Sequence, residues 1–371
     1  MNIGIDGNEA NIKTRVGSGQ YSFHILTQLN KLNKLHHFTV YLKSKPLSDM
    51  PKRNKLWHYK VIGPKLLWTK FALPLYLAIS KNNLDLFYSP THYSPTPSPI
   101  PTIPTIHDIG YLQKPDEFNK KDFYQLKNWT YLSIKQAKHI VAVSEFTKNE
   151  IIKEYKISPQ KISVIPNGIT KFKKHTKTES AKIMHKFKIT KPYFLSVGTL
   201  KPNKNYPFLI KAFSVFLSRQ RANALSSQLV ISGKKGWLFD EILKTVVDLK
   251  LQDSVIFTNY VTEKERNILF QNATATVLPS LYEGFGIPAI ESQSFDTPVI
   301  VSDIPSYREI LGNSGIYIDP NDEKSLIKAL SNIKNNHSQN YKRYLWTQSA
   351  TKLLHLFDNL KWYNISCYHR L

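Results

Sequence analysis

Short apolar segments rich in β-branched residues alternate with longer amphipathic segments along nearly the whole chain. This alternation is typical of repeated βα units, which build a parallel sheet covered by helices. In the first half, we expect strands at 2–6, 38–42, 84–88, 104–107, 140–144 and 163–166. In the second half, we expect strands at 193–198, 229–233, 255–258, 275–279, 298–302 and 316–318. The alternation starts afresh after residue 191, so the sequence predicts two doubly wound α/β domains.

The length of 371 residues supports this division, because one hydrophobic core rarely grows beyond about 250 to 300 residues. Residues 171–191 carry eight lysines against one glutamate, which indicates a polar linker followed by a short surface helix. We expect an N-terminal domain at 1–175, a C-terminal domain at 176–340, and a last segment at 341–371 whose apolar residues have helical spacing. The residues leave open which domain this last helix contacts.

The chain is strongly basic, with 51 lysines and arginines against 27 acidic residues and a net charge of +24. Such a surface attracts nucleic acid, anionic lipid or phosphorylated ligands. A nucleic-acid partner is disfavoured, because no basic segment with interleaved aromatic residues and no nucleic-acid-binding signature is present. The charge instead favours peripheral contact with an anionic membrane, where about two or more cooperating contacts are needed.

Several simple classes are excluded. The single cysteine, Cys367, rules out an intrachain disulfide and a zinc-finger type of site. The most apolar window, 71–80, is interrupted by a proline and is far shorter than the roughly 20 residues that span a bilayer. The N-terminal segment lacks the features of a signal peptide. We therefore expect a cytoplasmic protein, with peripheral contact at the inner face of the cell membrane.

The most informative motif is residues 281–291, Leu-Tyr-Glu-Gly-Phe-Gly-Ile-Pro-Ala-Ile-Glu, which follow an expected strand. Gly284 and Gly286 let the backbone approach a ligand closely, and the helix that follows would present N–H groups to an anion. Glu283 and Glu291 would flank this site and could hold sugar hydroxyls. The alternative is structural, with turn-forming glycines and solvated glutamates.

A second motif, residues 198–206, follows the strand expected at 193–198 and leads into a helix. Thr199 lies on this loop, and Lys204 just before the helix would add a point charge that suits a diphosphate. This signal is weak by itself, because a lysine before a helix is more often exposed to solvent and without a functional role.

The first half carries weaker signals. Gly17 and Gly19 lie in a loop after the first strand, but Ser22 breaks the full G-x-G-x-x-G pattern, which argues against NAD. His107 ends a strand and would face a ligand site, although a core or capping histidine is the alternative. No D-x-D pair and no cluster with metal-ligand spacing is present, so neither a metal nor another cofactor is expected.

Together these segments resemble a retaining glycosyltransferase of the GT-B fold, in family 4, over nearly the whole chain. The E-x7-E element from Glu283 to Glu291 carries the resemblance, and four further segments occur in the family's order: 144–147, 165–168, 233–237 and 303–305. The resemblance implies two Rossmann-like domains facing across a cleft, with a C-terminal helix that crosses back to the first domain. The N-terminal domain would bind the acceptor, and the C-terminal domain would bind a nucleotide sugar.

The resemblance also implies residue roles. Lys204 would neutralise the donor diphosphate, Glu283 would contact the donor sugar, and Glu291 would bind the ribose hydroxyls. The leaving phosphate would take the acceptor proton, which requires no metal. The expected catalytic residues are His107, Lys204 and Glu283. The expected donor-binding residues are Gly17, Gly19, Thr199, Lys204, Tyr260, Val261, Gly284, Phe285, Gly286, Ile287 and Glu291.

One position departs from the family pattern. Relatives often have arginine before the lysine of the second motif, whereas this chain has Asn203, so a diphosphate contact is lost or is supplied by Lys201 or Lys235. The resemblance implies transfer of a mannose-like or glucose-like hexose to a lipid-linked or polysaccharide acceptor. A GT-B sugar epimerase, a phosphorylase and an inactive nucleotide-sugar-binding protein stay open as alternatives.

Overall fold

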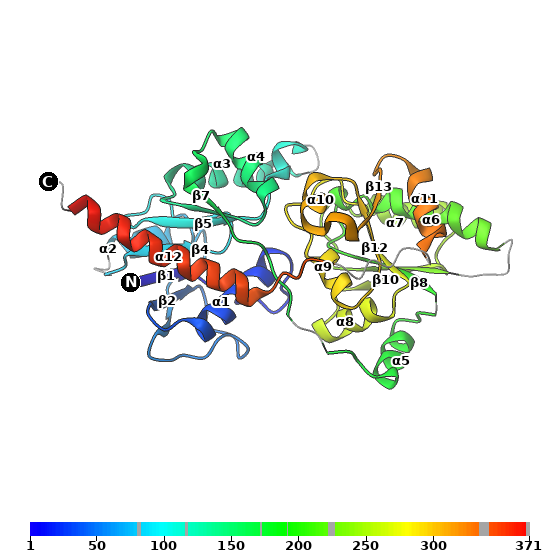
Figure 1. Cartoon of the computed structure of the whole chain (residues 1–371), viewed down its shortest axis with the longest axis horizontal. Coiled ribbons are helices and arrows are strands. Elements are labelled where there is room, and N and C mark those ends of the chain that lie inside the picture. Colours follow the sequence, from blue (N-terminus) through cyan, green and yellow to red (C-terminus); the bar gives the residue numbers. More distant parts are fainter. Residues whose placement is uncertain are drawn as a thin grey trace. The chain divides into compact units, whose positions relative to one another are not determined.

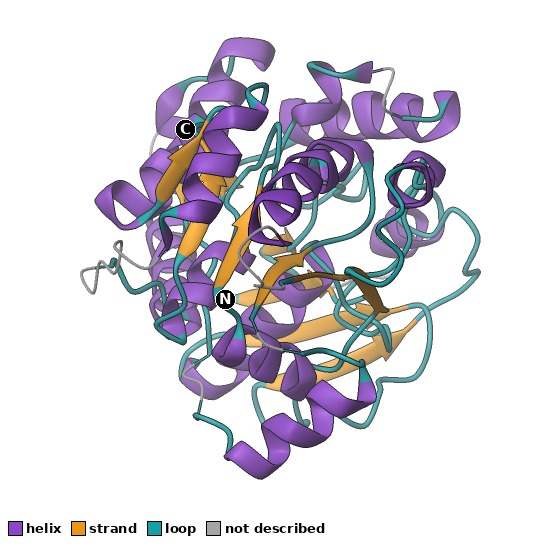
Figure 2. Cartoon of the chain, turned by 90° about the vertical axis from the view of Figure 1, so that its right-hand side faces the viewer, coloured by secondary structure: helices purple, strands orange, loops and turns teal. Residues whose placement is uncertain are grey.

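The computed structural model describes residues 1–79, 83–115, 118–170, 173–190, 192–221, 227–333 and 341–368. The chain divides into two compact units. Unit 1 comprises Met1–Pro115, Asn119–Gly168 and Tyr344–Leu371, and unit 2 comprises Ile169–Arg343 with Asp116–Phe118. Each unit contains one parallel sheet flanked by helices (Figures 1 and 2).

The sheet of unit 1 has seven strands in the order β3-β2-β1-β4-β5-β6-β7. Its strands are β1 Asn2–Asp6, β2 His37–Leu42, β3 Trp57–Val61, β4 Leu86–Ser89, β5 Thr102–Ile106, β6 Ile140–Ala142 and β7 Ile162–Val164. Every residue of β4, β5 and β6 is buried, as expected for central parallel strands covered on both faces. The strand order reverses between β1 and β4, so the topological switch point of this sheet lies between these two strands.

Five α-helices of unit 1 are described. They are α1 Ser18–Leu32, α2 Ala72–Ile79, α3 Lys120–Gln136, α4 Glu145–Tyr155 and α12 Trp346–Tyr368, with short 3-10 turns at Gly110–Leu112 and Pro159–Lys161. The last helix, red in Figure 1, packs against α1. The Trp346 ring stacks on His24 of α1 at 5.2 Å, and Ser349 Oγ donates to the Pro166 carbonyl at 2.6 Å. The expected return of the C-terminal helix to the first domain is therefore confirmed.

The sheet of unit 2 has six strands in the order β10-β9-β8-β11-β12-β13. Its strands are β8 Tyr193–Val197, β9 Gln228–Ser232, β10 Val255–Asn259, β11 Ala275–Leu278, β12 Val299–Ser302 and β13 Ile316–Ile318. Its described helices are α5 Lys177–Lys186, α6 Tyr206–Arg221, α7 Asp240–Asp248, α8 Glu263–Asn272, α9 Ile287–Ser294, α10 Pro305–Leu311 and α11 Glu323–Ser331, with 3-10 turns at Pro202–Lys204 and Gly312–Ser314. The switch point of this sheet lies between β8 and β11.

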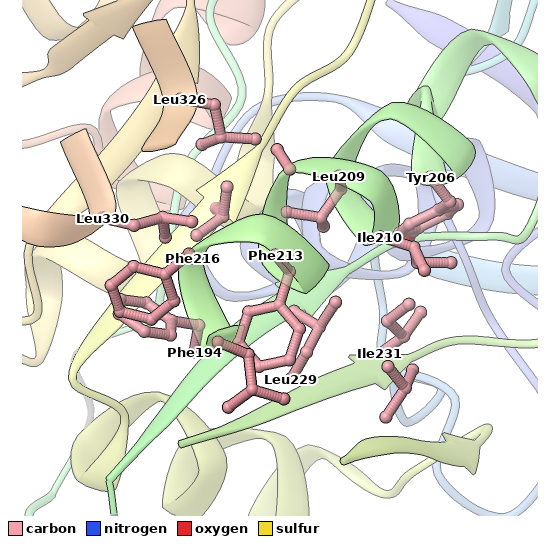
Figure 3. Close-up of a cluster of buried hydrophobic side chains, with 14 of the residues drawn as sticks. Phe194, Tyr206, Leu209, Ile210, Phe213, Phe216, Leu229, Ile231, Leu326 and Leu330 are labelled. Carbon is pink, nitrogen blue, oxygen red and sulfur yellow. The ribbon is translucent and has the colours of Figure 1, made fainter. Parts of the chain in front are cut away.

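The core of unit 2 packs α6 against the sheet. Phe213 and Phe216 of α6 pack against Phe194 of β8, and Leu326 of α11 belongs to the same buried cluster (Figure 3). Fully burying such a side chain contributes about 1.5 to 3 kcal/mol. This packing holds α6, the helix that follows the Gly198–Asn205 loop, in place.

Most predicted elements agree with the structure to within a few residues, with two differences. Strand β3 was not predicted, because only Trp57 among its five residues is buried and this edge strand lacks an apolar run. The last helix begins at Trp346 rather than at residue 341. The surface helix expected after the lysine-rich linker is confirmed as α5, which starts with a capping box between Thr176 and Glu179.

Candidate functional site

The loops after β8 and β11 meet at the switch point of unit 2. The two strands are adjacent and parallel, so their carboxyl ends lie at the same edge of the sheet. The Leu281 N–H donates to the Asn203 carbonyl at 2.8 Å, and Asn203 Nδ2 donates to the Tyr282 carbonyl at 3.2 Å. These two hydrogen bonds tie together the two motifs that the sequence singled out.

Lys204 and Glu283 form an ion pair at this edge. Each side chain keeps only 15% of its surface exposed, and Ser280 Oγ donates to Glu283 Oε1 at 2.8 Å. The sequence predicted both residues at a site but did not predict that they contact each other. The pair supplies a cationic group for a phosphate and a carboxylate for hydroxyl groups in one partly desolvated place.

The departure at Asn203 has a structural explanation. The side chain of Asn203 bonds to the loop that carries Glu283, while its Oδ1 atom is buried without a partner. The ammonium groups of Lys201 and Lys235 lie over the rings of Trp237 and Phe239, at 5.3 and 4.8 Å from the ring centres. Asn203 therefore holds the two loops together instead of adding charge.

Close backbone packing shapes the loop that carries Thr199. A Cβ added at Gly233 would lie 1.9 Å from the Gly198 carbonyl oxygen, so only glycine fits there. The same carbonyl accepts a hydrogen bond from the Tyr206 hydroxyl at 3.1 Å. Thr199 is thus held between β8 and the segment after β9.

The start of α9 requires glycine. Gly286 is the N-cap with φ of +89°, and an added Cβ would lie 2.4 Å from a ring carbon of Tyr307. Phe285 is buried, and Ile287 begins the helix, whose first N–H groups have no partner within the helix. This geometry can receive an anion, as the sequence motif indicated.

Tyr307 is a site residue that the sequence reasoning missed. Burial raises its pKa well above the ordinary value, and the nearby Glu283 carboxylate adds to the rise, so the hydroxyl stays protonated. That hydroxyl interacts with Ser280 and Glu283. Its place on α10, after strand β12, was the available signal, because this strand ends at the same sheet edge.

Glu291 is buried on α9 and pairs with Arg266 of α8, with 2.8 Å between Arg266 Nη2 and Glu291 Oε1. Burial raises the pKa of Glu291, and Arg266 opposes this rise. Helix α8 follows directly after Tyr260 and Val261, so Arg266 links this segment to Glu291. The Val261 side chain is buried in the core, which leaves its backbone as the part that can bind a ligand. Arg266 gave no signal in the sequence.

In unit 1, His107 lies just after β5. Its Nε2 atom is 3.0 Å from the Pro90 carbonyl oxygen, which can only accept, so Nε2 carries the hydrogen and Nδ1 is the free acceptor of the neutral ring. Burial and the adjacent His92 lower the pKa of His107 to about 4. His107 is therefore a neutral imidazole near pH 7.

The glycine loop lies close to His107. Tyr21 on the first turn of α1 contacts the His107 ring edge-on, with 4.8 Å between centroids. Gly17 is the N-cap of that helix with φ of +47°, and a Cβ added there would meet open space. A Cβ added at Gly19 would lie 3.1 Å from the Glu9 carbonyl oxygen. Within unit 1, the structure thus brings together the two predicted sites of the first half.

The described residues contain neither a metal-binding cluster nor a membrane-spanning helix. In the part of the chain that the structure describes, no group of three or more His, Cys, Asp or Glu side chains could hold a metal ion. Among the same residues, no helix is both long enough and apolar enough to cross a membrane.

Comparison with known proteins covers both units. The family model described as "Glycosyl transferases group 1" matches residues 178–351, and the one described as "Glycosyltransferase Family 4" matches residues 17–171. The O-antigen chain mannosyltransferase RfbU of Salmonella typhimurium is 32% identical over 339 residues, which cover 87% of this chain and 88% of the relative.

Solved structures agree on the fold. HepE from Anabaena, in complex with UDP-glucose, superposes with a TM-score of 0.75 at 15% identity, covering 97% of this chain and 100% of HepE. Sucrose-phosphate synthase from Thermosynechococcus elongatus gives 0.73 at 16% identity, covering 97% and 99% of the two chains. With the two Rossmann-like sheets and the returning helix, these matches show that the chain belongs to glycosyltransferase family 4, with the GT-B fold, and is an enzyme that transfers a sugar from a nucleotide sugar.

Proposed function

We propose that the protein transfers a hexose from a nucleoside-diphosphate sugar to a lipid-linked or polysaccharide acceptor, with retention of configuration and without a metal ion. The observation that carries the proposal is the ion pair between Lys204 and Glu283 at the switch point of unit 2. A cation and a carboxylate held together there match the two ends of the donor's reacting bond, the phosphate and the sugar.

The donor binds to the C-terminal domain, 176–340. Lys204 neutralises part of the negative charge of the diphosphate, and the amides of residues 284–287 add hydrogen bonds at the start of α9. Glu283 accepts hydrogen bonds from the sugar hydroxyls, and Glu291 accepts them from the ribose. Arg266 orients Glu291, and the backbone of Tyr260 and Val261 contacts the base.

The acceptor binds to the N-terminal domain, 1–175. The bond from the anomeric carbon to the phosphate oxygen breaks, and the acceptor oxygen attacks from the same face. The proton of the acceptor hydroxyl passes to the departing phosphate oxygen, so the step balances without an enzyme nucleophile. We propose that the neutral His107, together with Gly17 and Gly19, is the part of the N-terminal domain that takes part in the reaction.

A mannosyl donor is the first choice, because the relative RfbU is named a mannosyltransferase. We propose a cytoplasmic enzyme, and the net charge of +24 supports its peripheral contact with an anionic membrane, where a lipid-linked acceptor would reside. We propose no nucleic-acid partner.

The test starts with thermal unfolding in the presence of GDP-mannose, UDP-glucose and the free nucleotides. Transfer from the stabilising donor to a lipid-linked acceptor is then followed by mass spectrometry, with a chelator present, and the anomer is assigned by NMR. We expect Lys204→Ala and Glu283→Ala to lose transfer while keeping a cooperative unfolding transition. The matched control is the exposed ion pair between Lys264 and Glu179, with 2.6 Å between Nζ and Oε1. We expect the alanine variants of these two residues to keep transfer.

Each contrary result has a clear meaning. Retained transfer in both site variants would refute the proposed site. Binding of nucleotide sugar with no turnover would favour an inactive binding protein, and conversion of the donor sugar without an acceptor would favour an epimerase.

A further inference from the structure

One helix of unit 1 presents an apolar outer face. Phe71, Leu75 and Ile79 recur every four residues, so they share one face of α2 and of the residue just before it. Leu67 lies four residues earlier, in the turn before the helix, where its backbone is left-handed with φ of +47°. Together with Leu66, these four residues are 48% to 80% exposed. We call these five residues the α2 ridge. Exposed apolar side chains that gather in this way mark an interaction surface.

The opposite face of α2 is buried in the core of unit 1, so the helix already has its core-facing side and the ridge is a second apolar face. Trp68, Leu73 and Leu77 are buried in a cluster with Tyr41 of β2 and Phe87 of β4. Helix α2 carries no charged side chain, although its outer face is exposed. A helix that is apolar on its outer face as well suits a non-aqueous neighbour.

The charge around the ridge has one sign. Residues 50–84 contain six lysines and one arginine but no aspartate or glutamate. Lys65 adjoins the ridge in sequence and is exposed. Lys60 is exposed as well, and its Nζ atom lies 5.3 Å from the centre of the Tyr76 ring on α2. Cations therefore border the apolar ridge.

We propose that the α2 ridge inserts into the headgroup region of an anionic lipid bilayer, with Lys60 and Lys65 contacting lipid phosphates. This inference rests on the membrane contact proposed above and assigns it to a surface. Apolar side chains and cations are the two signals that stable interfacial binding requires. A second copy of this chain fits poorly, because pairing two ridges would place like-charged segments together. Nucleic acid offers no apolar partner for the four aliphatic side chains of the ridge, the three leucines and the isoleucine.

The experiment is vesicle co-sedimentation, which involves no sugar transfer and can therefore fail independently of the proposed function. Vesicles contain phosphatidylcholine with 30% phosphatidylglycerol, or phosphatidylcholine alone. We expect binding to the anionic vesicles only, weakened by high salt. The variant Phe71→Ser/Leu75→Ser/Ile79→Ser is expected to bind about tenfold or more weakly. Lys60→Gln/Lys65→Gln is expected to lose about fivefold for each lysine.

Matched controls lie on unit 2. Leu238→Ser/Val247→Ser replaces two exposed apolar residues, and Lys244→Gln/Lys328→Gln removes two exposed lysines. Both control variants are expected to bind vesicles like the unaltered protein. Urea unfolding of every variant verifies that the fold is intact.

A second readout does not depend on a disruptive substitution. Cys367 is the only cysteine, so a Cys367→Ser background allows a single environment-sensitive fluorophore on Leu75→Cys or on the control Leu238→Cys. We expect a blue shift with anionic vesicles only for the label at position 75. Unchanged binding of the ridge variant, equal binding to neutral vesicles, or no shift at position 75 would overturn the proposal. So would a dimer that dissociates on ridge substitution without vesicle binding, because that result identifies a second copy as the occupant.

Discussion

The ion pair between Lys204 and Glu283 makes a quantitative prediction about stability. Lys204→Met removes the positive charge but keeps most of the side-chain volume. It leaves the Glu283 carboxylate with 15% exposure and the hydrogen bond from Ser280. The opposite change, Glu283→Gln, leaves Lys204 without its anion but keeps an acceptor for Ser280.

The expected size follows from burial. Opposite charges about 3 Å apart attract by about 5 kcal/mol at an effective dielectric constant of 20, and desolvation offsets much of this. Removing one partner of a buried pair costs about 3 to 5 kcal/mol. Because both side chains keep some contact with water, solvation lowers the free-energy cost of leaving one charge unpaired here. We expect a loss of about 2 to 3 kcal/mol for Lys204→Met and about 1 to 2 kcal/mol for Glu283→Gln.

The assay is a double-mutant cycle by urea unfolding at pH 7. The double variant leaves no unpaired charge, so its loss should be smaller than the sum of the single losses by about 2 kcal/mol. The control is the same cycle on Lys264 and Glu179, an exposed pair for which we expect less than about 1 kcal/mol. A coupling energy at the site that is no larger than the control value would refute the pairing. Loss of transfer by about 100-fold or more in both single variants is expected in parallel.

Three further outcomes are expected from urea unfolding. Gly286→Ala adds a methyl group 2.4 Å from the tyrosine ring beneath it at φ of +89°, and should cost about 2 to 4 kcal/mol, whereas Gly312→Ala, with φ of +52° and open space around it, should cost about 1 to 2 kcal/mol. Equal losses would contradict the steric reasoning. Arg266→Met leaves the buried Glu291 carboxylate unpaired and should lower the free energy of unfolding by about 3 kcal/mol at pH 7. The double variant Arg266→Met/Glu291→Gln should recover part of this loss, and absence of recovery would argue against the pair. Since burial lowers the pKa of His107 to about 4, below its ordinary value of 6.5, the unfolded state takes up the proton first and stability falls as the pH drops from about 6.5 towards 4. His107→Gln should therefore lose about 2 kcal/mol less than the unaltered protein between pH 7 and pH 5, and an identical pH dependence would show that this histidine is not buried as a neutral ring.

Much of the fold was predictable because the hydrophobic period is a local property. Central strands such as β1 and β9 are short apolar runs, and neighbouring residues suffice to recognise them. Strand β3 was missed for the same reason, since an edge strand with one buried residue has no such run. Its pairing with β2 depends on a partner that lies far away in the sequence.

The candidate site was predictable in part. A residue that follows a parallel strand must lie at the carboxyl edge of the sheet, which is why Lys204 and Glu283 could be assigned to a site. Their mutual contact, across 79 residues of sequence, depends on β8 and β11 being neighbours. Arg266 and Tyr307 were missed because each gains its role only from a carboxylate on another element.

By itself, the sequence determined the two α/β domains, the glycine-rich and glutamate-bearing loops after the strands, and the family to which they point. These features are encoded by residues close together in the chain, through periodicity, turn chemistry and motif spacing. Only the tertiary structure decided that Asn203 bonds to the opposite loop, that Lys204 pairs with Glu283, and that one face of α2 stays exposed. The physical reason is that burial and ion pairing depend on which distant segments the sheet order brings into contact.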